Sequence, residues 1–438
     1  MKTIDKIKNN LINNELIRKG SGALLFRILG SLLGYFFLFL VTRNFGANSW
    51  GIFALSLAVL QISCMIGKFG LDIALIKFVA QFDSISKIKG IVYQSFLLAT
   101  IFSLFISLLV YYSSDYIALY FFNKAHLSKF IKLISYAILP LVIITTIAQV
   151  FRGMKEIRYF AFIEYVSKFL FSVFIFIFLL KFLNFKESDL AFYSFIISLI
   201  FVAIFSIIFL FKRLRGSAPT YVLSKKQIIN TAFPMMFSTS IFLLMSWSDT
   251  LMLGIYTTDY NVGIYNVALK ISMITAIILG AVNSILAPKI SETFNKNKLD
   301  DFKKLVVSST NLISISTMPV VLILFLFPEF FLSFFGGDFV EGKSVLYLLL
   351  IGQCVNAFSG SVGFILQMTG NENLFQKILL YTLIINIFLN YLLIPAYQIK
   401  GAAIASLVSM IIWNLVSVYF VYKKYNVLTF FSFGYYKK

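Results

Sequence analysis

Long apolar segments alternate with short polar segments along almost the whole chain. About twenty apolar residues form a helix long enough to cross the ~30 Å hydrocarbon core of a bilayer. The pattern predicts twelve such helices, at residues 22–42, 50–70, 90–112, 130–150, 160–181, 190–211, 228–255, 262–287, 304–326, 343–368, 375–395 and 401–422. The predicted fold class is therefore an all-α integral membrane protein.

The composition supports this prediction. Hydrophobic residues make up 60% of the chain and charged residues only 13%, whereas about a quarter of a soluble domain is charged. The N-terminus is too polar before its first apolar segment for a signal peptide. Cys64 and Cys354 both lie in apolar segments, so neither a disulfide framework nor a metal cluster is expected. His126 lies in a predicted loop, where a solvated side chain is the ordinary interpretation.

The formal net charge of +20 comes mostly from Lys and Arg residues in the N-terminal tail and in alternate loops. Cytoplasmic loops carry an excess of these residues, so both termini are predicted to be cytoplasmic. Two loops fit this rule poorly, the basic loop 124–132 on the outer side and the nearly uncharged loop 369–377 on the inner side. The charge indicates topology and a secondary attraction to anionic lipid headgroups, rather than a nucleic-acid partner.

The segment GDFVEGKS, residues 337–344, matches the nucleotide-binding pattern G-x-x-x-x-G-K-[ST]. It falls on the predicted outer side and follows the aromatic run FPEFFLSFF instead of a β-strand. Asp338 and Glu341 would also repel phosphate from the amides that a P-loop uses to bind it. We therefore predict a turn that re-enters the bilayer, with no nucleotide site.

The two halves of the chain resemble each other. Gly51-Ile52-Phe53 aligns with Gly263-Ile264-Tyr265, and the same spacing places IKFVAQF on PKISETF. Because each copy has an even number of spans, both copies enter the membrane in the same sense, related by a pseudo-two-fold axis along the membrane normal. We predict six-helix bundles at 1–211 and 228–438, a basic cytoplasmic linker at 212–227, and a substrate site between the bundles.

Five ionisable residues lie well inside predicted spans, where charges are costly and usually face protein or water. Arg27 either faces a cavity or extends its side chain to the cytoplasmic surface. Glu164 precedes Lys168 by one helical turn, so a structural ion pair explains them as well as a substrate site does. Asp249 and Lys270 lie on adjacent spans and are placed to pair. With three bases and two acids, the predicted cavity is mildly cationic and suits an anionic substrate.

The tenth predicted span carries polar and small residues on one face: Gln353, Asn356, Gly360, Gly363 and Gln367. Their spacing of three and four residues is that of one helical stripe. Helix packing through small residues explains the glycines equally well, whereas the amides favour a hydrated cavity. Asn386 and Asn390 form a further pair one turn apart on the eleventh span.

Three segments resemble one known family: residues 25–82, beginning LFRILGSLLG; residues 232–270, with Pro234, Asp249 and the Gly263–Tyr265 turn; and FFGGDFVEGKSVLYLLLIG at 334–352. They are similar to the Wzx-type O-antigen and polysaccharide repeat-unit flippases of the multidrug/oligosaccharidyl-lipid/polysaccharide (MOP) exporter superfamily. The resemblance extends over nearly the whole chain, but it is a pattern of apolar runs and a few fixed residues, with no catalytic signature.

This resemblance implies a MATE-like fold whose two bundles alternate between inward-open and outward-open states. The cargo would be an undecaprenyl-diphosphate-linked oligosaccharide, moved from the cytoplasmic to the outer leaflet of a bacterial inner membrane for O-antigen, capsule or exopolysaccharide synthesis. A polysaccharide polymerase and a chain-length regulator would be partners. No enzymatic activity or cofactor is implied beyond coupling to a proton or sodium gradient. Arg27 matches the first-helix position at which related flippases carry an arginine.

The sequence thus proposes a set of substrate-binding cavity residues, namely Arg27, Lys168, Lys270, Gln353, Asn356 and Gln367. Glu164 and Asp249 are the proposed coupling or charge-pair residues. In this hypothesis Arg27 binds the diphosphate on the inner side and Lys270 on the outer side, while Asp249 modulates Lys270 or carries a coupling proton.

Two alternative functions remain open. A MATE-like cation or drug antiporter of the same fold predicts an acid-rich cavity, which Glu164 and Asp249 hardly supply. A membrane-embedded glycan polymerase or glycosyltransferase predicts acidic residues in an external loop and a sizeable extracytoplasmic domain, whereas the predicted outer loops are short.

Overall fold

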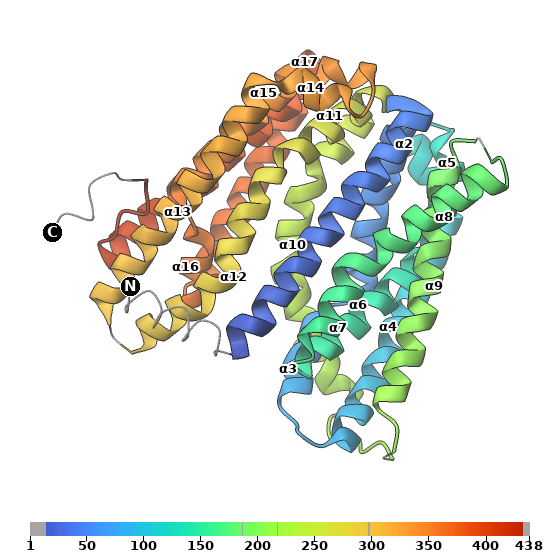
Figure 1. Ribbon diagram of the computed structural model, residues 1–438. Helices are drawn as coiled ribbons and strands as arrows, with labels where there is room; N and C mark the ends of the chain where they lie inside the picture. Colours follow the sequence, from blue (N-terminus) through green and yellow to red (C-terminus); the bar gives the residue numbers. More distant parts are fainter. Residues whose placement is uncertain (1–14, 186, 217, 297, 432–438) are drawn as a thin grey trace. The chain divides into compact units, whose positions relative to one another are not determined.

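The computed structural model describes residues 15–185, 187–216, 218–296 and 298–431, and every regular element in these ranges is helical (Figure 1). The first half contains α2 (Glu15–Lys68), α3 (Leu71–Ala80), α4 (Ile85–Tyr116), η1 (Ile117–Phe121), α5 (Leu127–Ser135), α6 (Ile138–Gly153), α7 (Ile157–Ala161), η2 (Phe162–Ser167), α8 (Lys168–Phe182) and α9 (Leu190–Arg213). The second half contains α10 (Lys225–Tyr256), α11 (Asp259–Ser272), α12 (Ile274–Asn295), α13 (Leu299–Leu326), α14 (Pro328–Ser333), η3 (Gly337–Gly342), α15 (Lys343–Ser359), α16 (Val362–Met368) and α17 (Glu372–Tyr425).

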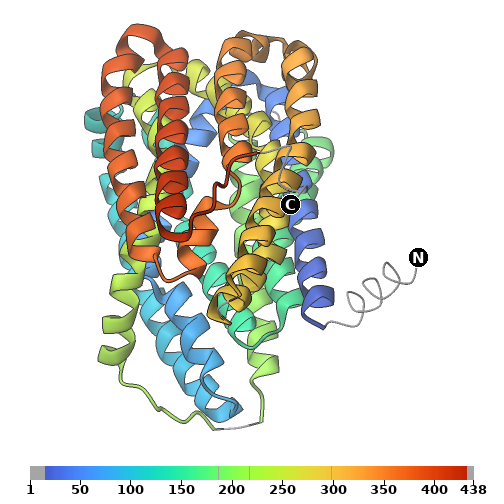
Figure 2. The ribbon, with the colours of Figure 1, turned by 90° about the vertical axis from the view of Figure 1, so that its left-hand side faces the viewer.

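These helices account for all twelve predicted spans. Six helices are long and apolar enough to cross a membrane, and four further spans are pairs of helices bent by 41–43°. Two of the six, α2 and α17, have 54 residues each and break at Gly46 and Gln398, where φ is 74° and 51°. Each of them therefore supplies two spans, and the two halves of α17 lie alongside each other (Figure 2). The predicted all-α integral membrane fold is confirmed.

The described chain forms two compact units. The first comprises Met1–Phe45 and Ile52–Leu243, and the second comprises Gly46–Gly51 and Leu244–Lys438. The division falls inside α10, which bends by 41° between Phe237 and Thr239, and not in the predicted linker at 212–227. The physical reason is that the first part of α10 packs into the first unit, where the backbone of Ala232 contacts Gly70.

The two glycines matched by the internal repeat pack against each other within the second unit. A Cβ on Gly51 would lie 3.0 Å from the nitrogen of Gly263, and a Cβ on Gly263 would lie 3.2 Å from the nitrogen of Gly51. Next to this contact, Trp50 Nε1 donates a hydrogen bond of 3.1 Å to Asn266 Oδ1. Both glycines are required because any side chain would meet a backbone.

The segment that mimics a P-loop has a different geometry. It follows the helix α14 and forms the 3-10 turn η3, which leads into α15 at Lys343. Lys343 Nζ donates to Glu329 Oε1 at 2.7 Å, and Glu341 accepts a hydrogen bond of 3.0 Å from Tyr260. The glycine-rich segment therefore connects two helices, as the sequence predicts, and its lysine binds a carboxylate.

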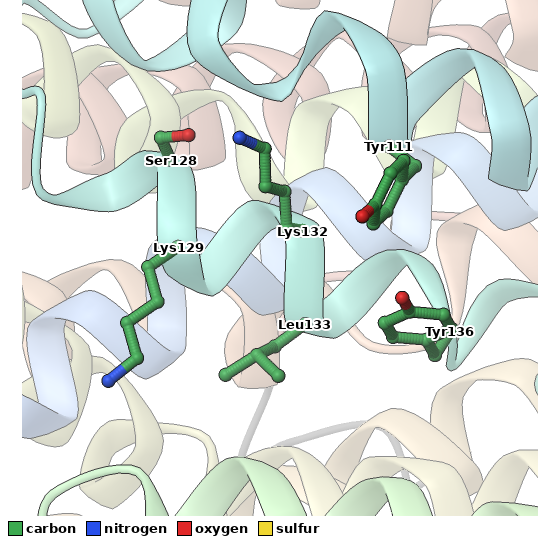
Figure 3. A pocket seen from close by; sticks show the side chains of 6 residues that line it. All are labelled: Tyr111, Ser128, Lys129, Lys132, Leu133 and Tyr136. Atoms are coloured by element: carbon green, nitrogen blue, oxygen red, sulfur yellow. The ribbon is translucent and has the colours of Figure 1, made fainter.

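Acidic residues neutralise two of the three lysines in the basic loop 124–132, which fits the topology rule poorly. Lys132 Nζ lies 2.8 Å from Asp115 Oδ2, Ser128 also donates to Asp115, and Lys129 pairs with Asp189. Figure 3 shows Lys129 and Lys132 pointing in different directions along the rim of a cavity of about 430 Å³. These two ion pairs offset part of the positive charge of the loop.

We predict that Gly51→Ala and Gly263→Ala each destabilise the fold by about 1–3 kcal/mol, because the added methyl group overpacks a backbone contact. The measurement is the thermal unfolding temperature of the protein in detergent. Gly337→Ala is the matched control, since a Cβ at that position meets nothing within 4 Å. Equal stability of all three variants would contradict the direct contact of the two glycines.

Candidate functional site

A buried carboxylate, that of Asp249 on α10, is the centre of a polar cluster in the second unit. Only 5% of Asp249 is exposed. Its Oδ2 accepts a hydrogen bond of 2.6 Å from the Tyr265 hydroxyl on α11 and another from Ser406 on α17. Its Oδ1 accepts hydrogen bonds of 3.2 Å from Asn386 and 2.7 Å from Asn390, both on the first half of α17.

A second layer of hydrogen bonds orients the two asparagines. Asn386 Oδ1 accepts hydrogen bonds from Ser248 at 2.6 Å and from Asn390 Nδ2 at 3.1 Å. Asn390 is fully buried, and its Oδ1 has no hydrogen-bond partner in the part of the chain that the structure describes. The cluster thus contains a carboxylate and one amide oxygen without a partner, and oxygen atoms of both kinds are ligands for hard cations.

The donors to Asp249 among the described residues are all uncharged. A buried carboxylate that is bound only by neutral donors keeps a large part of its desolvation cost, because no fixed positive charge compensates it.

The predicted partner of Asp249 lies elsewhere. Lys270 on α11 is half-buried, and its Nζ lies 6.0 Å from the centroid of the Trp247 ring, at the limit of a cation–π contact. Among the ion pairs of the described residues, none joins Lys270 to Asp249. Tyr265 and Ser406 donate hydrogen bonds to Asp249, in the role that the sequence analysis gave to Lys270. The spacing of residues along the chain does not show which serine of another helix will face Asp249, so Ser406 could not be identified from the sequence.

The first unit carries two compact ion pairs, one inside a span and one at the end of a span. Lys168 Nζ lies 3.6 Å from Glu164 Oε1 in the first pair, and Lys68 Nζ lies 3.0 Å from Asp72 Oδ2 in the second. Glu164 lies in the π-helical segment η2, a type of element that is frequent at functional sites. The predicted pairing of Glu164 with Lys168 is confirmed, and its second oxygen, Oε2, has no hydrogen-bond partner among the described residues.

Arg27 on α2 is exposed one turn before a tightly packed face. The Cβ position of Gly30 is filled by the backbone of Tyr165, and that of Gly34 lies 3.4 Å from the Phe169 ring. The two glycines therefore pack against η2 and α8, whereas Arg27 keeps its side chain accessible. Within the described part of the chain, the structure shows no carboxylate partner for Arg27.

The polar stripe of the tenth span is not continuous. α15 ends at Ser359, Gly360 has φ of 69°, and α16 begins at Val362 after a bend of 43°. The prediction of one straight stripe is wrong because Gly360 packs against Thr310 and turns the chain. Gly363 in turn packs against Phe375. The alternative explanation of the glycines, close helix packing, is confirmed.

This bend separates the three amides. Gln353 and Asn356 are each only 8% exposed inside the second unit, whereas Gln367 on α16 is exposed. The Asn356 Oδ1 has no partner among the described residues. The amides of the predicted cavity therefore occupy two environments.

The model described as "Polysaccharide biosynthesis protein" matches residues 16–294, and the model described as "MatE" matches residues 234–392. The former covers more than half of the chain.

Two curated proteins are similar in sequence. A "Probable low-salt glycan biosynthesis flippase Agl15" of Haloferax volcanii is 24% identical over 177 residues, 40% of this chain and 38% of that protein. A "Capsular polysaccharide biosynthesis protein CapF" of Staphylococcus aureus is 26% identical over 200 residues, 45% of this chain and 50% of that protein. The chain thus matches half or less of the length of these two relatives.

Solved structures share the fold at low sequence identity. An inward-facing multidrug resistance MATE family transporter of the MOP superfamily is 13% identical, with a TM-score of 0.76 over 92% of this chain and 98% of that one. The lipid II flippase MurJ in an inward closed conformation is 14% identical, with a TM-score of 0.74 over 92% and 87%. Both likenesses establish the MATE-like fold of this chain.

We predict that Tyr265→Phe destabilises the protein by about 1–3 kcal/mol, since it removes a hydrogen bond to a buried carboxylate. Thermal unfolding in detergent measures the change. Tyr260→Phe is the control, because the Tyr260 hydroxyl donates to Glu341 near the surface. An equal loss of stability in Tyr265→Phe and Tyr260→Phe would contradict a buried hydrogen bond between Tyr265 and Asp249.

Proposed function

The chain belongs to the polysaccharide biosynthesis protein family, and from that membership we propose that it is a flippase for a lipid-linked oligosaccharide. The cargo is an undecaprenyl-diphosphate-linked repeat unit, and the protein moves it from the cytoplasmic to the outer leaflet by alternating access. The names of two relatives, a glycan biosynthesis flippase and a capsular polysaccharide biosynthesis protein, support this substrate class. Bacterial inner-membrane location, cytoplasmic termini, and a polymerase and chain-length regulator as partners belong to the same proposal.

The observation that carries the proposal is the charge of Arg27. The fold alone does not separate a lipid flippase from a drug transporter, because both kinds of protein share it. In the first unit, however, Lys68 and Lys168 each have a carboxylate partner, whereas Arg27 is exposed with none among the described residues. An accessible arginine suits a diphosphate, which its planar guanidinium can bind through two parallel hydrogen bonds.

In this mechanism only the headgroup needs shielding from the hydrocarbon. The sugars and the diphosphate follow polar residues, while the prenyl chain stays among the lipid tails. Arg27 binds the diphosphate before translocation, and the half-buried Lys270 receives it afterwards. Lys168 is less suited to this role because Glu164 already holds it. Gln353, Asn356 and Gln367 remain candidates for contacts with the sugars.

The Asp249 cluster is proposed as the coupling site. A proton or a sodium ion bound there would neutralise the carboxylate and supply the energy that resets the carrier. The proposal rests on two observations: the Asp249 carboxylate is buried, and the oxygen of Asn390, whose Nδ2 donates to Asp249, has no hydrogen-bond partner in the described ranges. Cation binding then changes the charge of the cluster on which two helices converge.

The alternative functions predict other sites. A cation or drug antiporter of this fold predicts an acid-rich cavity, whereas the two acids well inside the spans are Asp249 and Glu164, and Glu164 is paired with Lys168. A membrane glycan polymerase or glycosyltransferase needs acidic residues accessible from outside. There, Asp115 and Asp189 are occupied by Lys132 and Lys129.

We predict that Arg27→Glu lowers flipping by at least about tenfold, because it replaces a charge-assisted contact with repulsion. The measurement is surface polysaccharide together with accumulated prenyl-linked intermediates in a strain that lacks the native gene. Arg27→Lys should retain partial activity, and Arg215→Glu, at an exposed site outside the spans, should be neutral. Normal polysaccharide in an Arg27→Glu protein that is present in the membrane would remove Arg27 from the mechanism.

Asp249→Asn should abolish the dependence of transport on an ion gradient, because the amide neither takes up a proton at neutral pH nor neutralises a cation. Proteoliposomes with an imposed proton gradient or an imposed sodium gradient separate the two cations. Binding of lipid-linked substrate should persist. Asp301→Asn, exposed on α13, is the control. A variant that still responds to the same gradient as the unmodified protein would rule out Asp249 as the coupling residue.

A further inference from the structure

In the first unit, α4 and α9 lie next to the segment that leads into α10. A cavity of about 760 Å³ opens there. Tyr93, Leu97 and Thr100 line it from one face of α4, at the spacing of a helical stripe. Phe211 lines it from α9, and its ring centroid is 5.7 Å from that of Tyr93.

The third wall of the cavity is the segment that leads into α10, and backbone contacts hold it against α4. Thr220 N donates a hydrogen bond of 2.9 Å to Ser86 O at the start of α4. Gly90 allows this close approach, since a Cβ there would lie 3.2 Å from Tyr221 N. The segment therefore lies against α4 and brings Tyr221 and Lys225 to the cavity. The cavity is built by the fold and is not a gap between loose loops.

The lining of the cavity combines a cation, polar side chains and apolar surface. Lys225 is exposed, and no ion pair of the described residues involves it. Gln94 and Thr100 contribute an amide and a hydroxyl group from α4. Between them in the chain, Leu97 is 46% exposed, and the same helix continues with Ile101 at 53%.

This combination suits a glycerophospholipid, with its phosphate, its glycerol and ester groups, and its acyl chain. Tyr93 and Thr100 are separated by about 10 Å of helix rise, so the wall is deep enough to hold the glycerol region and the start of a chain. The basic end of α4 corresponds to the predicted cytoplasmic side, where anionic lipids attract basic segments. We propose that the first unit binds one anionic phospholipid of the inner leaflet in this cavity. The proposal does not depend on the transported substrate.

The test uses the full-length protein in detergent and native mass spectrometry during a titration with phosphatidylglycerol. Lys225→Gln should weaken the tightest lipid adduct about fivefold, as expected for one lysine at a phosphate. Lys226→Gln is the matched control, because Lys226 is exposed and adjacent but does not line the cavity. Leu97→Trp, which fills the cavity from an exposed position, should also remove this adduct while the remaining lipids stay bound.

Three results would overturn the proposal. Equal weakening by Lys225→Gln and Lys226→Gln would show a diffuse charge effect, and equal affinity for phosphatidylcholine would show no role for the anionic phosphate. Undecaprenyl phosphate that displaces phosphatidylglycerol from the Lys225-dependent site at lower concentration would assign the cavity to the carrier lipid instead. The proposal is supported if the protein prefers phosphatidylglycerol to both phosphatidylcholine and undecaprenyl phosphate. Lys225→Gln and Leu97→Trp should lose this preference, and Lys226→Gln should keep it.

Discussion

The hydrocarbon core of a bilayer offers no water to a buried polar group, and this constraint determines how the protein arranges its interior. The clearest case is Asp249, where Tyr265, Ser406, Asn386 and Asn390 converge on one carboxylate. The carboxylate is on α10, and its donors come from α11 and from both halves of α17. The break of α17 at Gln398 allows two parts of one continuous helix to reach the same residue. The helices of the second unit therefore pack in the same arrangement that supplies hydrogen bonds to the buried carboxylate of Asp249.

The same constraint produces different solutions in the first unit. There, Lys168 is paired with Glu164 one helical turn away in the same span, and Lys68 at the end of α2 is paired with Asp72 at the start of α3. The pair of Glu164 and Lys168 lowers the cost of insertion without help from another helix. Arg27 departs from this arrangement, and for that reason it is the residue on which the proposed recognition of a diphosphate depends.

Glycines determine where the helices approach and where they turn. Gly51 and Gly263 allow direct backbone contact between the matched positions of the two repeats. Gly30 allows α2 to pack directly against the backbone of η2. Gly360 ends α15 and redirects the chain into α16. A transporter needs helices that pack closely yet change direction within the membrane, and glycine provides both properties because it lacks a Cβ.

The sequence by itself determined the features that depend on local chemistry. Apolar length predicted the twelve spans, the internal repeat matched Gly51 with Gly263, and one helical turn predicted the pair of Glu164 and Lys168. The misfit of GDFVEGKS to a P-loop was also evident, because a strand and a compatible charge were missing from the adjacent residues. Each of these inferences rests on a periodicity or on neighbours in the chain.

Only the tertiary structure decided which distant residues meet. The sequence identified Asp249, Asn386 and Asn390 but paired Asp249 with Lys270, because charge complementarity is visible in a sequence whereas the position of a hydroxyl such as that of Ser406 is not. It also predicted an unbroken stripe from Gln353 to Gln367, since spacing alone does not reveal that Thr310 fills the space beside Gly360. Contacts between helices depend on their three-dimensional paths, and those paths are set by packing of the whole chain.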